Sequence, residues 1–301
     1  MAIFKKRETL TQNIAYMGIM AAINVIFVLL TTYVLPVLFF ILIFILPLTS
    51  TVVCLFCNKK YFPIYVIATV GICILTTLGD FSNTLFYVIP SIVSGFAFGF
   101  LIERNVSSIW CILFGSIITL GFNYLAVPII QALYQRNIIT TFASIFNLVN
   151  YKYLDYVAPC FFLFLSFAQT SISYFVIKSE LPKLGVEYDD KETNLFVYIG
   201  GLVSLLLTIL FTFVFPQLAY FFGMFIVYFA IIVFVEFCED INVFGLVFSG
   251  VSLLVTFAIF GIFYNRIPQP LGVMLVFILF ILILVAGLIS KYLLKNHKEL
   301  K

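Results

Sequence analysis

Hydrophobic residues occur along the chain in long continuous runs, which short polar stretches interrupt. Each run approaches the roughly 20 apolar residues that an α-helix needs to cross a bilayer, and the runs do not alternate as barrel strands do. Cutting them at charges, prolines and turn residues predicts ten spans, at residues 14–33, 36–56, 62–78, 84–102, 108–130, 156–177, 195–215, 218–237, 243–264 and 271–294. The turns at Pro36 and Pro216 are the weakest cuts, so eight or nine spans remain alternatives. The pattern predicts an all-α polytopic integral membrane protein of about ten transmembrane helices.

Composition excludes a soluble globular fold. Of the 301 residues 64% are hydrophobic and 10% are charged, whereas a soluble domain carries about 25% charged residues. The bilayer is therefore the expected partner. The net charge of +3 is small and no dense basic cluster occurs, so we expect no nucleic-acid partner. The excess of Phe, Ile, Tyr, Asn and Lys hints at a bacterium with an AT-rich genome.

A polar segment divides the runs into six and four. Residues 178–194 contain three Lys and five acidic residues. We predict a six-helix transmembrane half at 1–178, a cytoplasmic linker at 179–194 and a four-helix transmembrane half at 195–301.

The distribution of Lys and Arg predicts that both termini are cytoplasmic, because cytoplasmic loops carry an excess of these residues. In this orientation 13 basic residues are cytoplasmic and three are outside. The split favours an even number of spans in a multi-pass protein of the cell membrane. The cytoplasmic set is Lys5, Lys6, Arg7, Lys59, Lys60, Arg104, Lys178, Lys183, Lys191, Lys291, Lys295, Lys298 and Lys301, and the outside set is Arg136, Lys152 and Arg266.

Polar amides lie within three predicted spans, at Asn24, Asn123 and Gln169. We favour interhelical hydrogen bonds for them, which stabilise membrane helices by about 1 kcal/mol each. The alternative is that Asn123 and Gln169 line a solute cavity, since intramembrane polar groups often mark a pathway or site.

The outer ends of the first six spans offer walls and a cover for such a cavity. Tyr33, Tyr87 and Tyr156 lie near these ends, and a tyrosine supplies a flat apolar ring with a polar tip. The loop 131–155 has enough apolar surface to fold down as a lid, contributed by Phe142, Ile145, Phe146 and Leu148.

Two predicted spans carry small residues at helical spacing, which lets another helix approach closely. Ser91, Gly95 and Gly99 form such a stripe in the fourth span. A second stripe, at Ala15, Gly18 and Ala22, lies near the cytoplasmic end of the first span. We predict helix packing or partner docking at these positions.

The sequence contains no constellation typical of an enzyme: no Walker motif, histidine cluster or G-x-S-x-G. Cys54 and Cys57 have metal or redox spacing, but no second pair follows. We therefore expect no catalysis, no metal and no cofactor. Glu236, Glu239 and Asp240 share one helical face if the eighth helix extends that far, as a solvated helix end or as a cation or partner contact.

The stretch from Thr11 to Pro128 resembles the YybS-like family of bacterial membrane proteins, through Ile45-Leu46-Pro47, the run SIVSGFAFGFLIERN and the small-residue start of the first span. The chain departs from that family near the last helix, where the family pattern has an Asp and an Arg and this sequence has Lys291 and Lys295. That family resembles the substrate-binding S components of energy-coupling-factor (ECF) transporters. This resemblance implies six helices, a solute site near the outer end, and docking on a membrane energising subunit with ATPases through Ala15, Gly18 and Ala22.

Three functions remain open. The first is a transport-type protein that binds a small solute near the outer face while a partner supplies energy. The second is a membrane scaffold or regulator that recruits cytoplasmic enzymes, and the third is an integral-membrane enzyme. We favour the first.

Overall fold

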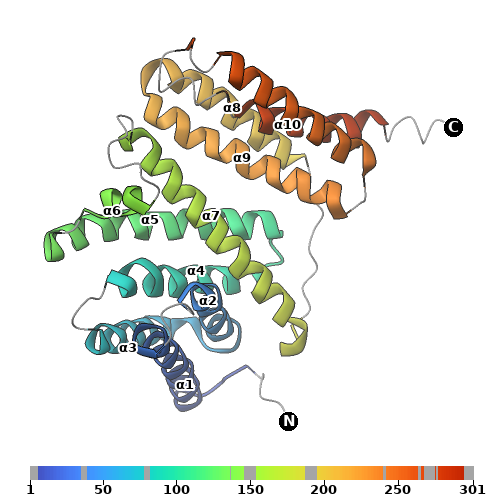
Figure 1. Cartoon of the computed structure of the whole chain (residues 1–301). Coiled ribbons are helices and arrows are strands. Elements are labelled where there is room, and N and C mark those ends of the chain that lie inside the picture. Colours follow the sequence, from blue (N-terminus) through green and yellow to red (C-terminus); the bar gives the residue numbers. More distant parts are fainter. Residues whose placement is uncertain are drawn as a thin grey trace. The chain divides into compact units, whose positions relative to one another are not determined.

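The structure of the protein is a computed structural model. It describes residues 6–34, 39–77, 82–135, 137–145, 154–186, 195–239, 242–263, 266–267, 275 and 277–294, and within these ranges all regular secondary structure is helical (Figure 1). The chain divides into two compact units. The first comprises Met1–Ile145 and Leu165–Glu192, and the second comprises Phe146–Phe164 and Thr193–Lys301. Residues 146–164 thus group with the four C-terminal helices, and the proposed linker, of which 187–194 lie outside the described residues, stays a prediction.

The first unit is built from α1 to α6 and the larger part of α7. Three short segments join or cap these helices: the 3-10 helices η3 (Lys59–Tyr61) and η5 (Pro182–Leu184), and the π-helix η4 (Thr84–Val88), which leads into α4. The bounds are α1 Leu10–Leu29, extended by the π-helix η1 Leu30–Val34, α2 Phe39–Phe56, α3 Phe62–Thr76, α4 Ile89–Ile102, α5 Ser108–Tyr134, α6 Ile138–Ile145 and α7 Leu154–Glu180.

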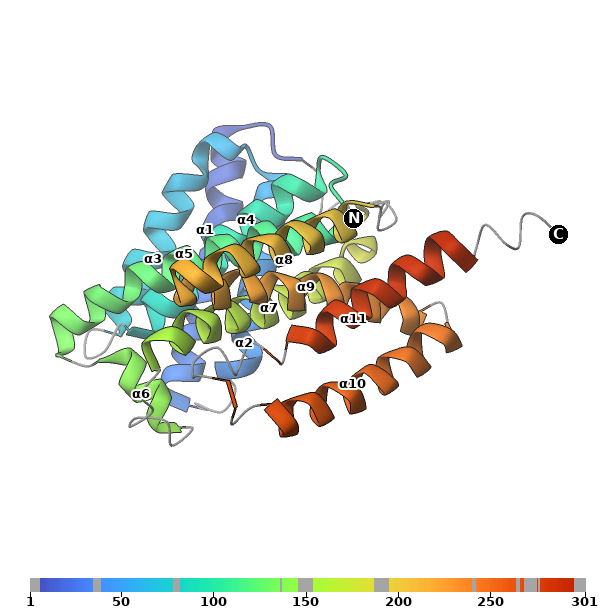
Figure 2. The same cartoon turned by 90° about the horizontal axis from the view of Figure 1, so that it is seen from above.

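The second unit contains the C-terminal helices. They are α8 Phe196–Val214, α9 Pro216–Glu239, α10 Val243–Phe263 and α11 Phe277–Leu288, which the π-helix η7 Ile289–Leu294 continues. α9 packs against α8, α10 and α11, and α10 packs along α11 (Figure 2).

The predicted class of protein is confirmed. Among the described residues eight helices are long and apolar enough to cross a membrane, and two shorter apolar helices, Leu46–Phe56 and Phe277–Lys291, lie within the remaining predicted spans. The count of ten and the cytoplasmic termini stay predictions.

The predicted loop 131–155 differs from the structure, because it contains a helix. α5 continues to Tyr134 and ends at Gln135, which has a left-handed conformation. The Asn137 side chain then caps α6, accepting hydrogen bonds from the backbone N–H groups of Ile139 and Thr140 at 3.0 and 3.2 Å. The eight residues of α6 are too few to span a bilayer, so α6 was not among the spans predicted from hydrophobic length. Of the proposed lid, Phe146 and Leu148 lie outside the described residues, as do the side chains of Phe142 and Ile145.

Close backbone approach joins α2 and α4 in the first unit. A Cβ atom added at Gly95 would overlap the backbone of Pro47, and one at Gly99 would lie 2.6 Å from Cβ of Cys54. The Thr51 hydroxyl donates across this contact to the carbonyl oxygen of Gly95 at 2.8 Å. The two glycines of the small-residue stripe, Gly95 and Gly99, thus lie against α2, where side chains larger than hydrogen have no room.

Polar contacts tie together the predicted cytoplasmic end of the first unit. The backbone N–H of Asn58 donates to Oδ1 of Asn13 at 2.7 Å, which links the α2–α3 turn to α1. Glu103, just after α4, forms ion pairs with Lys59 and with Lys6, the latter at 3.5 Å. These contacts hold the N-terminal segment, the α2–α3 turn and the end of α4 in one arrangement.

Candidate functional site

A buried network of hydroxyl and amide groups joins α1, α2 and α3. The Asn24 amide donates to the Tyr65 hydroxyl at 2.8 Å and accepts from the Thr49 hydroxyl at 2.7 Å. The Ser50 hydroxyl lies 3.2 Å from that of Tyr65. All four side chains are buried, and each has a partner within the network. Asn24 therefore serves helix packing, as we favoured from the sequence.

A second polar layer lies between α4, α5 and α7. The hydroxyls of Ser116 on α5 and Thr170 on α7 are 2.5 Å apart, and both are fully buried. The Gln169 amide reaches the Ser91 hydroxyl on α4 at 3.5 Å, the long limit of a hydrogen bond. Polar side chains of three helices thus converge inside the first unit.

Two buried polar groups beside this layer lack a partner. Thr119 and Asn123 follow Ser116 on the same face of α5 at helical spacing. They are 0% and 7% exposed, yet the Thr119 hydroxyl and the side-chain oxygen Oδ1 of Asn123 make no hydrogen bond to any residue that the structure describes. An unsatisfied buried polar group costs about 1–3 kcal/mol, and no water replaces the bond in hydrocarbon. These two atoms are the best-defined candidates for contact with a ligand.

The aromatic walls predicted for the site are only partly where we expected them. Tyr33 is 65% exposed, and its hydroxyl donates to the carbonyl oxygen of Thr76 at 2.6 Å. It fastens η1 to the end of α3 instead of facing the polar layer. Tyr87 is half-buried on η4, a segment that contacts α5. The Tyr156 side chain lies outside the described residues.

The structure separates the two amides proposed for a solute. Gln169 bonds to Ser91 on α4, whereas Asn123 lies on α5, one helical turn beyond Thr119 and two turns beyond Ser116. Sequence analysis missed Ser116, Thr119 and Thr170, because a single hydroxyl in a span is common. Their signal was the spacing of Ser116, Thr119 and Asn123 at i, i+3 and i+7, which places three polar residues on one face of an otherwise apolar helix.

The small-residue stripe of α1 faces away from the fold of the first unit. Ala15, Gly18 and Ala22 are exposed, and a Cβ atom added at Gly18 would meet nothing within 4 Å. This differs from Gly95 and Gly99, which are in contact with α2.

Metal-binding groups do not gather in the described part of the chain: no three His, Cys, Asp or Glu residues lie close enough to hold an ion. All six cysteines are described there, and none forms a disulfide. Of the acidic group at the end of α9, Glu236 lies 3.8 Å from Lys291, and Asp240 is outside the described residues.

Comparisons of the chain with protein-family models, with curated proteins and with solved structures find no match.

Proposed function

We propose that this membrane protein binds a small solute in the polar layer of the first unit, and that it acts in transport with a partner that supplies the energy. The proposal is carried by two buried atoms that have no hydrogen-bond partner among the described residues, the Thr119 hydroxyl and the side-chain oxygen Oδ1 of Asn123. The carbonyl accepts a hydrogen bond and the hydroxyl donates or accepts one. The solute therefore carries at least one N–H or O–H group for Asn123 and a second polar group, donor or acceptor, for Thr119.

Neighbouring residues support a site at this depth. Ser116 and Thr170 already satisfy each other, so they bound the site without competing for the solute. The π-helix η4 contacts α5, and π-helical segments occur frequently at functional sites.

The test is a thermal-shift screen of vitamins, nucleobases and amino acids against the purified chain. We expect at least one compound to raise the Tm of the wild type, and the increase to be lost in Thr119→Val and Asn123→Leu. Thr256→Val is the matched control, because Thr256 on α10 also has a buried hydroxyl without a partner but belongs to the second unit. The proposal fails if no compound stabilises the wild type, or if Thr119→Val and Thr256→Val respond alike.

The partner in this proposal is a membrane energising subunit with ATPases. It docks on the exposed stripe of Ala15, Gly18 and Ala22. Gly18→Leu is expected to leave the isolated chain folded, since no atom lies within 4 Å of a Cβ atom added at Gly18. The same substitution is expected to lower co-purification of the ATPases from native membranes. Recovery of a soluble signalling enzyme in place of ATPases would favour the scaffold alternative.

A further inference from the structure

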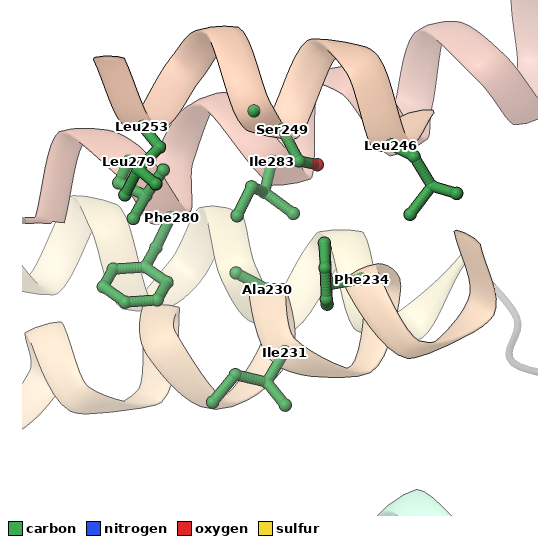
Figure 3. A pocket seen from close by; sticks show the side chains of 10 residues that line it. Ala230, Ile231, Phe234, Leu246, Ser249, Leu253, Leu279, Phe280 and Ile283 are labelled. Carbon is green, nitrogen blue, oxygen red and sulfur yellow. The ribbon is translucent and has the colours of Figure 1, made fainter. Parts of the chain in front are cut away.

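A groove of about 370 Å³ lies between α9, α10 and α11 of the second unit (Figure 3). α9 contributes Ala230, Ile231 and Phe234, while α10 and α11 contribute the remaining lining residues. The groove is open toward the surroundings of the helices, because Ile231 and Phe234 are exposed.

The lining carries only one side chain with a polar atom. Ser249 is that residue, and its hydroxyl donates to the carbonyl oxygen of Gly245, one turn earlier in α10, at 2.7 Å. A polar solute would find no free donor or acceptor among the lining side chains. α9 and α10 are apolar enough to cross a membrane, so the groove lies at the depth of the hydrocarbon. These properties select a hydrocarbon chain as the occupant.

One end of the groove is polar, and this end lies on the predicted cytoplasmic side. Asn242 precedes Leu246 by one helical turn on α10, and its amide donates to the Ser290 hydroxyl at 2.5 Å. Ser290 follows Ile283 by two turns, so it continues the face of α11 that lines the groove. The bond between them therefore lies one to two helical turns beyond the lining residues, at this end of the groove.

A charged pair lies next to the bond between Asn242 and Ser290. Nζ of Lys291 on η7 lies 3.8 Å from a carboxylate oxygen of Glu236 on α9, and both side chains retain exposed surface. All three helices that form the groove thus place a polar group at the same end. Hydrocarbon along the groove and an ion pair at its head complement a zwitterionic phospholipid, whose phosphate faces Lys291, whose ammonium group faces Glu236 and whose acyl chain is apolar.

We infer that this groove is a binding site for one phospholipid of the cytoplasmic leaflet, with an acyl chain between α9, α10 and α11 and the phosphate at Lys291. The inference is independent of the solute site, because it concerns other residues in the other unit. It identifies the second unit as a lipid-binding part of the protein.

The chain provides a matched pair of glycines on α10 for the test. Gly250 lines the groove and Gly261 does not, and a Cβ atom added at either meets nothing within 4 Å. Gly250→Leu therefore fills the groove without a clash, while Gly261→Leu makes the same change of helix propensity elsewhere. Lys291→Gln removes the charge and keeps most of the length of the side chain.

Native mass spectrometry of the full chain, titrated with a palmitoyl-oleoyl phosphatidylethanolamine in detergent, measures the binding. We expect the wild type and Gly261→Leu to bind one lipid with equal affinity. Gly250→Leu should weaken binding about tenfold or more by displacing several methylene groups, and Lys291→Gln about tenfold by removing a charged hydrogen bond. Equal lipid binding by Gly250→Leu and Gly261→Leu would overturn the inference. So would a change from oligomer to monomer in Gly250→Leu alone, because the groove would then hold a helix of a second copy.

Discussion

The two units fill their interiors in different ways. In the first unit, buried polar side chains bond across helices, as Asn24 does to Tyr65 and Ser116 to Thr170. In the second unit, the hydroxyls of Ser204, Thr208, Ser249 and Ser252 donate to the carbonyl four residues earlier in their own helix. Directional bonds between helices thus lie in the interior of the first unit, whereas in the second unit the interhelical bond from Asn242 to Ser290 lies at the helix ends and the packing between depends more on shape.

The glycines of α4 and several glycines of the second unit also differ in their neighbours, although Gly115 of α5 in the first unit lies against the ring of Phe98. Those of α4 lie against backbone atoms of α2. In the second unit, Gly200, Gly223 and Gly245 each lie against a phenylalanine ring, of Phe229, Phe277 and Phe237 respectively. A ring is able to tilt and a backbone is not, so the second unit tolerates small changes of shape better. Selective polar contacts suit a solute site, and adaptable apolar surfaces suit lipid.

We expect the largest effect from a substitution at Gly95, in the contact between α2 and α4. We expect Gly95→Leu to reduce the free energy of unfolding by more than about 4 kcal/mol or to prevent folding, because the new side chain overlaps the Pro47 backbone. The yield of monodisperse protein and its Tm in detergent measure this. Gly18→Leu, with open space around it, is the control and should stay within about 0.5 kcal/mol of the wild type. Equal losses of stability in both variants would show that the close approach of α2 and α4 does not determine the effect.

The interhelical network offers the next test. Asn24→Leu leaves the hydroxyls of Tyr65 and Thr49 without their shared partner, which we expect to lower stability by about 2–3 kcal/mol. Ser249→Ala, which removes a bond within one helix, should cost less than about 0.5 kcal/mol. Adding Tyr65→Phe to Asn24→Leu should recover part of the loss, because both partners are then absent. A loss of equal size at Asn24 and Ser249 in a denaturant titration would remove the contrast between the units.

A smaller effect is expected where glycine meets a ring. Gly223→Ala places a methyl group against the ring of Phe277, and we expect a net loss of about 1 kcal/mol after the gain in helix propensity. Gly250→Ala, facing open space, should be neutral or stabilising by up to about 1 kcal/mol. Thermal unfolding of both variants measures the difference. If Gly223→Ala is also stabilising, the ring has moved freely and the second unit is more adaptable than we infer.

The smallest effect concerns the charges at the end of the first unit. The hydrogen bond from Lys59 lowers the pKa of Glu103 below its ordinary value of 4.5. The ionised carboxylate therefore contributes stability above pH 4.5, and this contribution is lost as the pH falls below 4.5 through the lowered pKa. Because the Glu103 side chain is more than a third exposed, we expect Glu103→Gln to cost less than about 0.5 kcal/mol at pH 7, and this cost to shrink as the pH falls below 4.5. Tm against pH for both proteins tests this, and a difference in Tm that does not change with pH would contradict it.

The helices were predictable from the sequence because hydrophobic length alone identifies a span. Each of the ten predicted ranges overlaps a helix of the described residues, and three of these helices adjoin a π-helical segment. The π-helices η1, η4 and η7 were not predicted, since their extra residue per turn depends on tertiary contacts. The site was less predictable. Asn123 was identified as a polar residue in a span, but its lack of a partner depends on neighbours that the sequence does not place, and Tyr33 differs from its expected role because its hydroxyl finds the free carbonyl of Thr76.

The bond between Asn24 and Tyr65 has a consequence for the order in which the protein is made. The two residues are 41 positions apart in the chain, and a ribosome needs on the order of seconds to synthesise that length. During this interval the amide of α1 has left the ribosome and its partner has not. The first helix therefore gains its full stability in the bilayer only when α3 arrives, which makes the N-terminal three helices one assembly step during membrane insertion.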